Sequence, residues 1–205
     1  MKLTWLVCIS LLALAAVGAW AGDLVNGGFE EGFRGEDSWI MANHWGGMYS
    51  GGAFGTMLFY DETSDTRTGS HSQGLGASVS DLPCYITQTV DVIPGQWYMV
   101  SAWVKPISGH ASLYLSEWAP DVGMTRGPES IATPTGDWVL LQQSMQANAS
   151  SSMEIHIMCY KDSDVDGRML VDDVTFSLVP EPSSVITLLC GIGGMGGMIW
   201  RRKSA

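Results

Sequence analysis

Hydrophobic and polar residues alternate with a period of two along most of the chain between its two ends. The clearest alternating runs are residues 73–79, 85–93, 97–105, 111–118, 138–145, 153–160 and 168–178. This period is typical of β-strands with one buried face, and Gly, Pro, Asp and Ser separate the runs. Pro94-Gly95 and residues 162–167 have the composition of turns. The pattern therefore predicts an all-β chain with seven or more strands in an antiparallel sandwich.

The first residues of the chain differ from this alternating part. Lys2 precedes an apolar stretch over residues 3–17, and Ala19-Trp20-Ala21 has the small-x-small form of a cleavage site. Residues 1–21 are therefore interpreted as a secretory signal peptide.

The last residues form a second distinct segment, 179–205. A 16-residue apolar run over 185–200 is followed by three basic residues. As a helix this run spans roughly 24 Å, less than the ~30 Å hydrocarbon core, so it predicts a short transmembrane helix. The basic residues after it favour a cytoplasmic C-terminus, which places everything upstream outside.

Pro180-Glu181-Pro182 stands just before this apolar run. The order of Pro-Glu-Pro, thin apolar helix and basic end resembles the PEP-CTERM sorting tail of Gram-negative bacteria that make extracellular polysaccharide. The resemblance implies transient contact with the inner membrane through the tail, cutting by an exosortase-type membrane protease, and delivery to the cell surface or extracellular matrix. A plain tail-anchored protein is the alternative.

Residues 22–178 remain as one domain, long enough for a real hydrophobic core. Four of the 10 basic residues and one of the 21 acidic residues lie in the two end segments, so the domain keeps six basic and 20 acidic residues, a formal charge of −14. This charge argues against nucleic acid and anionic membrane surfaces as partners of the domain. Residues 31–70 are glycine-rich with weak periodicity, and we expect long loops there.

Three parts of the domain resemble the galactose-binding-type jelly rolls of carbohydrate-binding modules. They are Leu24-Val25-Asn26-Gly27-Gly28-Phe29-Glu30-Glu31-Gly32 near the start, residues 88–95 with 98–105 in the middle, and Leu170-Val171-Asp172-Asp173-Val174 near the end. The resemblance implies a jelly-roll sandwich with polysaccharide as its partner. It does not extend to residues 43–66, whose contribution to binding stays open.

Strand alternation assigns side chains to faces independently of this resemblance. The runs 97–105, 111–118 and 153–160 each have one continuous apolar parity, and the opposite parity carries aromatic and polar residues. If the three runs are neighbours in one sheet, its outer face presents a candidate sugar site made of Trp103, Tyr114, Trp118, Lys105, Glu154 and His156. Flat rings stack on sugar C–H faces, while charged and amide groups bond the hydroxyls. A strand face covered by residues 43–66 is the alternative.

Calcium is a predicted structural cofactor, because the resembling modules commonly bind it where the first strand meets the last. The resemblance maps the acidic ligands onto Glu30 and Asp172, with backbone carbonyls completing the shell. An N-terminal loop tied only by hydrogen bonds is the alternative. The aspartates at alternating positions in 162–166 also match a calcium-loop spacing, and we interpret them as a solvated acidic hairpin.

Two cysteines, Cys84 and Cys159, lie in the domain. Both share the apolar parity of their runs, so both side chains are expected to point inward from facing sheets. In an oxidising compartment this arrangement predicts a disulfide between them.

Catalytic motifs are missing from the sequence: it contains no Gly-x-Ser-x-Gly, no His-Glu-x-x-His and no phosphate-binding loop. The sequence predicts a non-enzymatic, exported glycan-binding module of the cell surface or exopolysaccharide matrix. A structural or adhesive matrix protein without a small-ligand site is the alternative, and exposure of Trp103, Tyr114 and Trp118 on one face distinguishes the two.

Overall fold

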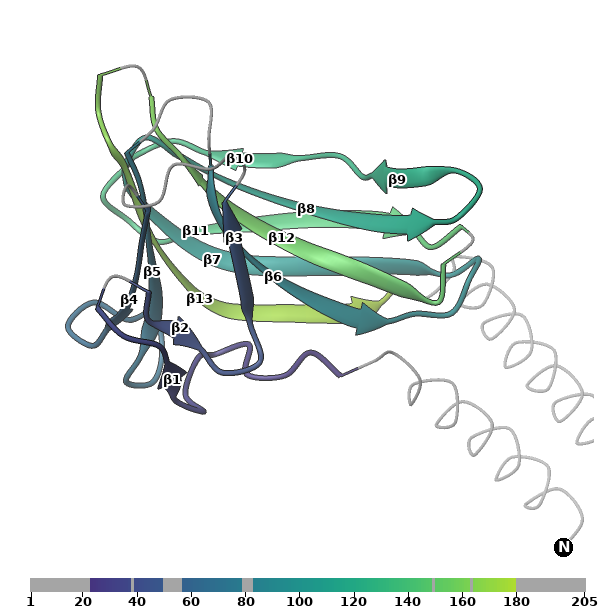
Figure 1. Ribbon diagram of the computed structural model, residues 1–205, viewed down its shortest axis with the longest axis horizontal. Coiled ribbons are helices and arrows are strands. Elements are labelled where there is room, and N and C mark those ends of the chain that lie inside the picture. The colour runs from purple at the N-terminus through teal and green to yellow at the C-terminus, as the bar shows by residue number, and fades with distance from the viewer. Residues whose placement is uncertain are drawn as a thin grey trace, which may run out of the picture.

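The chain folds into a two-layered β-sandwich, and its two sheets overlap in the view of Figure 1. The computed structural model describes residues 23–37, 39–49, 57–78, 83–148, 150–162 and 164–179. The strands in this part are β1 (Phe33–Arg34), β2 (Met41–Ala42), β3 (Gly46–Tyr49), β4 (Met57–Glu62), β5 (Ser72–Ala77), β6 (Cys84–Asp91), β7 (Trp97–Ser108), β8 (His110–Ala119), β9 (Gly123–Arg126), β10 (Ser130–Ala132), β11 (Val139–Gln146), β12 (Ser152–Tyr160) and β13 (Gly167–Leu178).

The strands form two large antiparallel sheets. One sheet has the order β10-β8-β12-β6-β3, with β9 also paired to β8. The other has the order β11-β7-β13-β5-β4, and β1 and β2 form a small separate hairpin. This all-β antiparallel arrangement confirms the predicted fold class.

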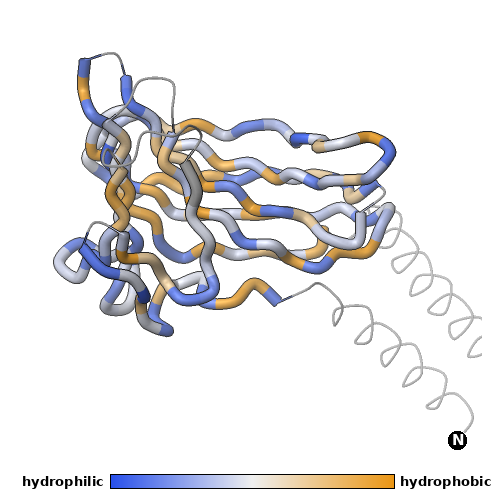
Figure 2. The backbone as a smooth tube through the Cα atoms, in the orientation of Figure 1, coloured by the Kyte–Doolittle hydropathy of each residue, from blue (hydrophilic) through white to orange (hydrophobic). Residues whose placement is uncertain are grey.

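The core lies between the two large sheets, and strand alternation explains why. In β7 the side chains of Tyr98, Val100, Ala102 and Val104 are fully buried, and each residue between them faces away from the core. Leu113 and Leu115 of β8 and Ile155 and Ile157 of β12 do the same from the other sheet. Figure 2 shows this alternation as changes of colour along the strands.

All seven predicted runs are strands in the structure, namely β5, β6, β7, β8, β11, β12 and β13. The turn at Pro94-Gly95 joins β6 to β7, as predicted. The expectation of long loops over residues 31–70 is right for the loop between β4 and β5 and wrong for the rest of the described region, which contains β1 to β4. Its third and fourth strands are edge strands, one in each large sheet, and pair with β6 and β5. Glycine in β3 and its neighbourhood hid the period-two pattern.

The predicted signal peptide (1–21), the sorting motif Pro180-Glu181-Pro182 and the apolar run after it lie outside the described residues. Within the described part of the chain, no helix is long and apolar enough to cross a membrane.

Candidate functional site

The predicted sugar-binding residues lie on two different outer faces of the sandwich. Trp103 and Lys105 are on β7, in the five-stranded sheet. Tyr114 and Trp118 on β8, together with Glu154 and His156 on β12, are in the six-stranded sheet. β8 and β12 are neighbours in one sheet, as predicted, whereas the prediction that β7 lies in the same sheet is wrong.

The turn between β7 and β8 is the physical reason for this separation. Gly109 in that turn has φ +70°, and a Cβ at this position would lie 2.0 Å from the carbonyl oxygen of Tyr160. Glycine is free of both restrictions, so the chain turns tightly and passes from one sheet into the other. Consecutive strands with the same alternation therefore belong to opposite layers.

Trp103 is covered by a loop that packs on the outer face of the five-stranded sheet. The guanidinium carbon of Arg67 lies 4.4 Å from the centroid of the Trp103 ring, a cation–π contact. Beside it, the Lys105 ammonium donates to the Asp65 carboxylate at 2.7 Å. Arg67 and Asp65 both belong to the β4–β5 loop (residues 63–71). This face is thus already occupied by the chain's own side chains.

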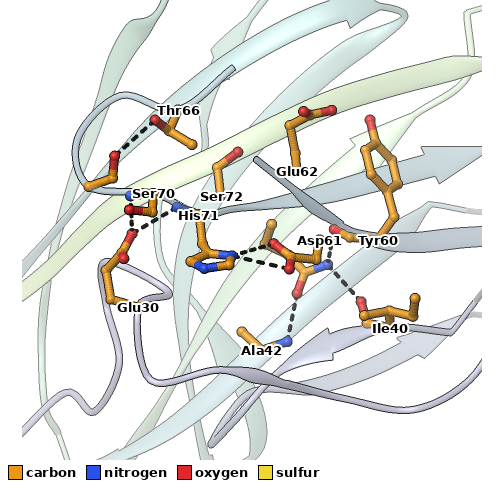
Figure 3. A network of polar contacts seen from close by, with 12 residues as sticks. Glu30, Ile40, Ala42, Tyr60, Asp61, Glu62, Thr66, Ser70, His71 and Ser72 are labelled. Carbon is orange, nitrogen blue, oxygen red and sulfur yellow. Dashed lines mark hydrogen bonds and ion pairs between the residues drawn. The ribbon is translucent and has the colours of Figure 1, made fainter. Parts of the chain in front are cut away.

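Two carboxylates hold the β4–β5 loop in place. Asp172, which is fully buried, accepts hydrogen bonds from the backbone N–H groups of Arg67, Thr68 and Asp173 at 2.8, 3.1 and 2.7 Å. Glu30 accepts from the N–H groups of Ser70 and His71 at 2.8 and 2.9 Å, as Figure 3 shows.

The two carboxylates differ in their ionisation. The N–H of Ser70 is the main cause that holds the pKa of Glu30 below its ordinary value. Burial raises the pKa of Asp172, and its three N–H donors only partly offset that effect. The residues predicted to bind calcium are therefore loop-fastening groups in the structure.

The structure places the two predicted calcium ligands against the same loop. No group of three or more His, Cys, Asp or Glu side chains suited to a metal occurs among the described residues.

Calcium binding is accordingly kept as a prediction with a direct test. If the ion binds only the folded state, calcium at a hundredfold excess over Kd adds about 2.7 kcal/mol to the free energy of unfolding. Calorimetry with calcium and with chelator measures this gain, and Asp172→Ala should abolish it. Asp162→Ala is the matched control, because Asp162 lies in the β12–β13 turn and pairs with His110. Identical melting in calcium and chelator would exclude the site.

His71 forms an ion pair next to Glu30. Its Nδ1 lies 2.8 and 3.1 Å from the two carboxylate oxygens of Asp61, and Figure 3 shows the ring between the two acidic side chains. The hydrogen bond to Asp61 is the main cause that raises the pKa of His71. The protonated imidazole thus favours the folded loop.

This pair predicts a pH dependence of stability. Because the folded-state pKa of His71 is raised, its contribution is fully present below the unfolded value of about 6.5 and is lost as the pH rises through the folded-state pKa. We expect the melting-temperature difference between wild type and His71→Gln to shrink from about pH 6 to about pH 8. Thermal denaturation at a series of pH values measures it, and a difference that is constant with pH would contradict the assignment.

The outer face of the six-stranded sheet carries a stack of aromatic and charged groups. The His156 ring lies parallel to the Tyr114 ring, with centroids 4.5 Å apart and planes 10° apart. The Arg126 guanidinium of β9 lies 3.8 Å from the centroid of the Tyr114 ring and pairs with Glu129 at 2.6 Å. Tyr85 of β6 makes a tilted contact with His156, with centroids 6.1 Å apart. We call these residues, with Glu154, Ser112, Ser116 and Trp118, the aromatic face.

Hydrogen bonds fix one nitrogen of His156 and leave the other free. Its Nε2 lies 2.9 Å from the Ser116 hydroxyl and 3.2 Å from the Glu154 carboxylate, and this bond holds the pKa of Glu154 below its ordinary value. Among the described residues, His156 Nδ1 and the Ser112 hydroxyl are the buried side-chain polar atoms without a hydrogen-bond partner. Native proteins leave few such atoms unpaired, so each is a candidate contact for a ligand.

The predicted aromatic residues also differ in how much of each side chain is exposed to solvent. Tyr114 is only 6% exposed, and burial raises its pKa to about 12. Trp118, at the end of β8, is 63% exposed and lies opposite Met124 of β9. Trp103, Tyr114 and Trp118, the three rings predicted to bind sugar, all lie in the described part of the chain. Of these rings, Trp118 is the one on the aromatic face that is freely open to solvent.

Sequence reasoning missed Arg126, Tyr85 and Ser112. Tyr85 and Ser112 have the same outward parity as the predicted residues, so the alternation that found Tyr114 could have found them. Arg126 has no such signal, because it lies in a four-residue strand with weak alternation.

The two cysteines are adjacent in one sheet. Cys84 of β6 and Cys159 of β12 are opposite each other in the β6–β12 pairing, and both are fully buried. The structure has both as free thiols, which differs from the predicted disulfide. The inward direction of both side chains is as predicted, whereas their placement in facing sheets is wrong. Burial raises the pKa of both thiols, that of Cys84 to about 12.

Comparison with known proteins shows which solved structures have a similar architecture. No protein-family model matches the chain. No curated protein matches it either. Solved structures do match: the CBM22-1 xylan-binding domain from Paenibacillus barcinonensis Xyn10C has a TM-score of 0.56 and 18% identity, over 80% of this chain and 99% of that domain. The C-terminal family 22 carbohydrate-binding module of Clostridium thermocellum Xyn10B has a TM-score of 0.52 and 12% identity, over 80% of this chain and 96% of that one.

The chain shares the jelly-roll sandwich fold of carbohydrate-binding modules. A third match is the enzymatically active domain of bacteriophage CBA120 tailspike protein 4, with a TM-score of 0.54 and 15% identity, over 77% of this chain. The chain spans only 21% of that tailspike chain. Two of these three similar structures are carbohydrate-binding modules. At these identities the similarity concerns the fold.

Proposed function

We propose that the chain is an exported, non-catalytic glycan-binding module and that it binds polysaccharide on the aromatic face. The observation that carries the proposal is the pair of buried, unpartnered polar atoms, His156 Nδ1 and Ser112 Oγ, within a face of stacked rings. Sugar hydroxyls supply the missing hydrogen bonds, while Trp118 offers an exposed ring for stacking.

The Arg126 side chain covers the Tyr114 ring of the aromatic face and can be displaced from it. Its guanidinium lies 3.8 Å from the centroid of the Tyr114 ring, and its side chain is 39% exposed. Moving this side chain into solvent breaks one cation–π contact and one surface ion pair, each worth about 1 kcal/mol or less. A sugar ring that stacks on Tyr114 offsets that loss.

Proteins of the same fold support the choice of ligand class. One similar domain is described as xylan-binding, and another was solved in complex with β-1,4-galactotriose. The acidic chain favours a neutral or weakly charged polysaccharide. A glycan array with xylan, β-1,4-galactan and host exopolysaccharide tests the proposal. Binding to none of them would overturn it.

A structural matrix protein is the second candidate function, and one observation favours it. Two of the three rings expected to stack on sugar, Trp103 and Tyr114, are each covered by an arginine guanidinium. A domain that works by packing or adhesion would keep both arginine side chains over these rings. The same array distinguishes the candidates, because this function predicts no saccharide binding.

Export and sorting complete the proposed function. The predicted signal peptide and the Pro180-Glu181-Pro182 segment with its short apolar run support delivery to the surface or matrix after a membrane protease acts near this motif. The tail contacts the membrane before that processing. Intact-mass analysis of surface material should find a chain that lacks the residues after this segment. A complete C-terminus in that material would contradict sorting by cleavage.

A further inference from the structure

One end of the sandwich gathers three turns and the exit of the chain. Residues 92–96 join β6 to β7, residues 147–151 join β11 to β12, and the β8–β9 hairpin turns after Ala119. Strand β13 ends beside them, since Val179 N–H donates to the Trp97 carbonyl at 2.8 Å. We call this the exit end, and it lies at the right of Figure 1.

Hydrogen bonds tie these turns into one surface. Val92 N–H donates to the Ser151 carbonyl and Ala147 N–H to the Gln96 carbonyl, both at 2.9 Å. Asn148 connects the β11–β12 turn to the hairpin, because its N–H donates to the Glu117 carboxylate at 3.0 Å. The turns of the exit end are therefore linked to one another by hydrogen bonds.

Apolar groups are exposed at this end, and charge is nearly absent from its sequence. Ile93 and Trp97 are each 44% exposed, Met124 is 63% exposed and Val122 is 72% exposed. In residues 92–97, 118–124, 146–152 and 178–179 the sequence has a single charged residue, Asp121, and Asp91 and Glu117 stand next to these ranges. Such an exposed apolar surface with few charges is typical of an interaction site.

The opposite end has the reverse character. There β12 joins β13 through residues 161–166, which contain three aspartates and one lysine. The strand pairings place this turn far from the exit end, since Tyr160 lies opposite His110, and Arg168 opposite Ser108. The domain thus has an acidic end and an apolar end.

The short segment after Val179 limits the distance between the exit end and a membrane that holds the apolar tail. The apolar run begins at Val185, six Cα–Cα steps further on, which an extended chain spans in at most about 20 Å. With the tail in a membrane, as proposed above, the exit end stays within that distance of the bilayer surface.

We propose that the exit end contacts the interfacial region of a phospholipid bilayer while the tail is in place, with Ile93, Trp97, Val122 and Met124 among the headgroups. This inference rests on the proposed membrane contact of the tail. Tryptophan favours this interface, and apolar side chains gain free energy on leaving water. The acidic end points away from the bilayer, because it lies at the opposite end of the strands from the exit end. The contact holds the domain upright, with the aromatic face open to the side.

A polarity-sensitive label tests the proposal. Cys8→Ser and Cys190→Ser are introduced into the full chain, and an added cysteine, Val122→Cys, carries a nitrobenzoxadiazole group. Cys84 and Cys159 stay unlabelled in the folded chain because they are buried with raised thiol pKa values. The matched control is Asp164→Cys in the acidic turn, which is exposed like Val122. Both proteins are reconstituted into phosphatidylcholine vesicles.

The expected result is a blue-shifted emission that lipid-borne quenchers suppress for the label at 122, and a water-like emission for the label at 164. Flotation of the vesicles reports the tail separately. Floating protein with water-like emission at both positions would overturn the exit-end contact and leave the tail proposal intact, whereas protein that does not float would overturn both. A shift at 122 that disappears on dilution into excess vesicles assigns the surface to a second copy of the chain and also overturns the proposal.

Discussion

Asp172→Ala is expected to lower the free energy of unfolding by about 3 kcal/mol, the largest effect of a single carboxylate change in this domain. The side chain is fully buried and accepts three backbone N–H groups. Truncation leaves these donors without their acceptor and releases the β4–β5 loop, which holds Arg67 over Trp103. A desolvated N–H without a partner costs roughly 1–3 kcal/mol, and water that reaches the freed loop reduces the total.

Two control variants separate this role from a general effect of charge. Asp172→Asn keeps one acceptor oxygen, so we expect a smaller loss. Asp173→Asn affects one hydrogen bond, from the Thr68 hydroxyl, and should cost about 1 kcal/mol or less. Asparagine also tolerates the positive φ of +48° at this position. Chemical denaturation of the four proteins, in chelator so that no metal contributes, measures the order. Equal stability of wild type and Asp172→Ala would show that the loop is held by other contacts.

Trp118→Ala is expected to weaken polysaccharide binding by roughly thirtyfold, or about 2 kcal/mol. The ring is 63% exposed at the end of β8, so a sugar can stack on it without first displacing a protein group. Stacking buries a large apolar area of a rigid side chain, and for this reason aromatic residues dominate the affinity of such sites.

Trp103→Ala is the matched control for the same residue type. It lies on the other sheet under Arg67, so its removal should leave the affinity unchanged. Isothermal titration with the polysaccharide that gives the strongest array signal compares the three proteins, and circular dichroism confirms that each is folded. Loss of affinity in Trp103→Ala with none in Trp118→Ala would move the site to the five-stranded sheet.

The alternation along 97–105, 111–118 and 153–160 was sufficient to predict strands and the direction of nearly every side chain in them. Val104, Leu115 and Ile157 point into the core, as their parity requires. This works because the two faces of a half-buried strand differ in a property, hydrophobicity, that each residue carries by itself. For the same reason both cysteines were predicted to point inward.

The sequence did not determine which sheet each strand joins. A strand has the same period in either layer of a sandwich, so β7 and β8 look equivalent until the turn at Gly109 carries the chain across. The candidate face therefore combined residues that the fold separates. It also missed Arg126, whose place over Tyr114 depends on the β8–β9 pairing.

By itself, then, the sequence determined an all-β sandwich, the inward and outward side of its long strands and the acidic character of the domain. Tertiary structure alone decided that Asp172 fastens a loop more than 100 residues earlier, that Cys84 and Cys159 are opposite each other in one sheet, and that the apolar turns gather where the chain leaves at Val179. These features arise from pairings between strands distant in sequence. Local periodicity contains no information about such pairings, since many registers bury the same apolar face.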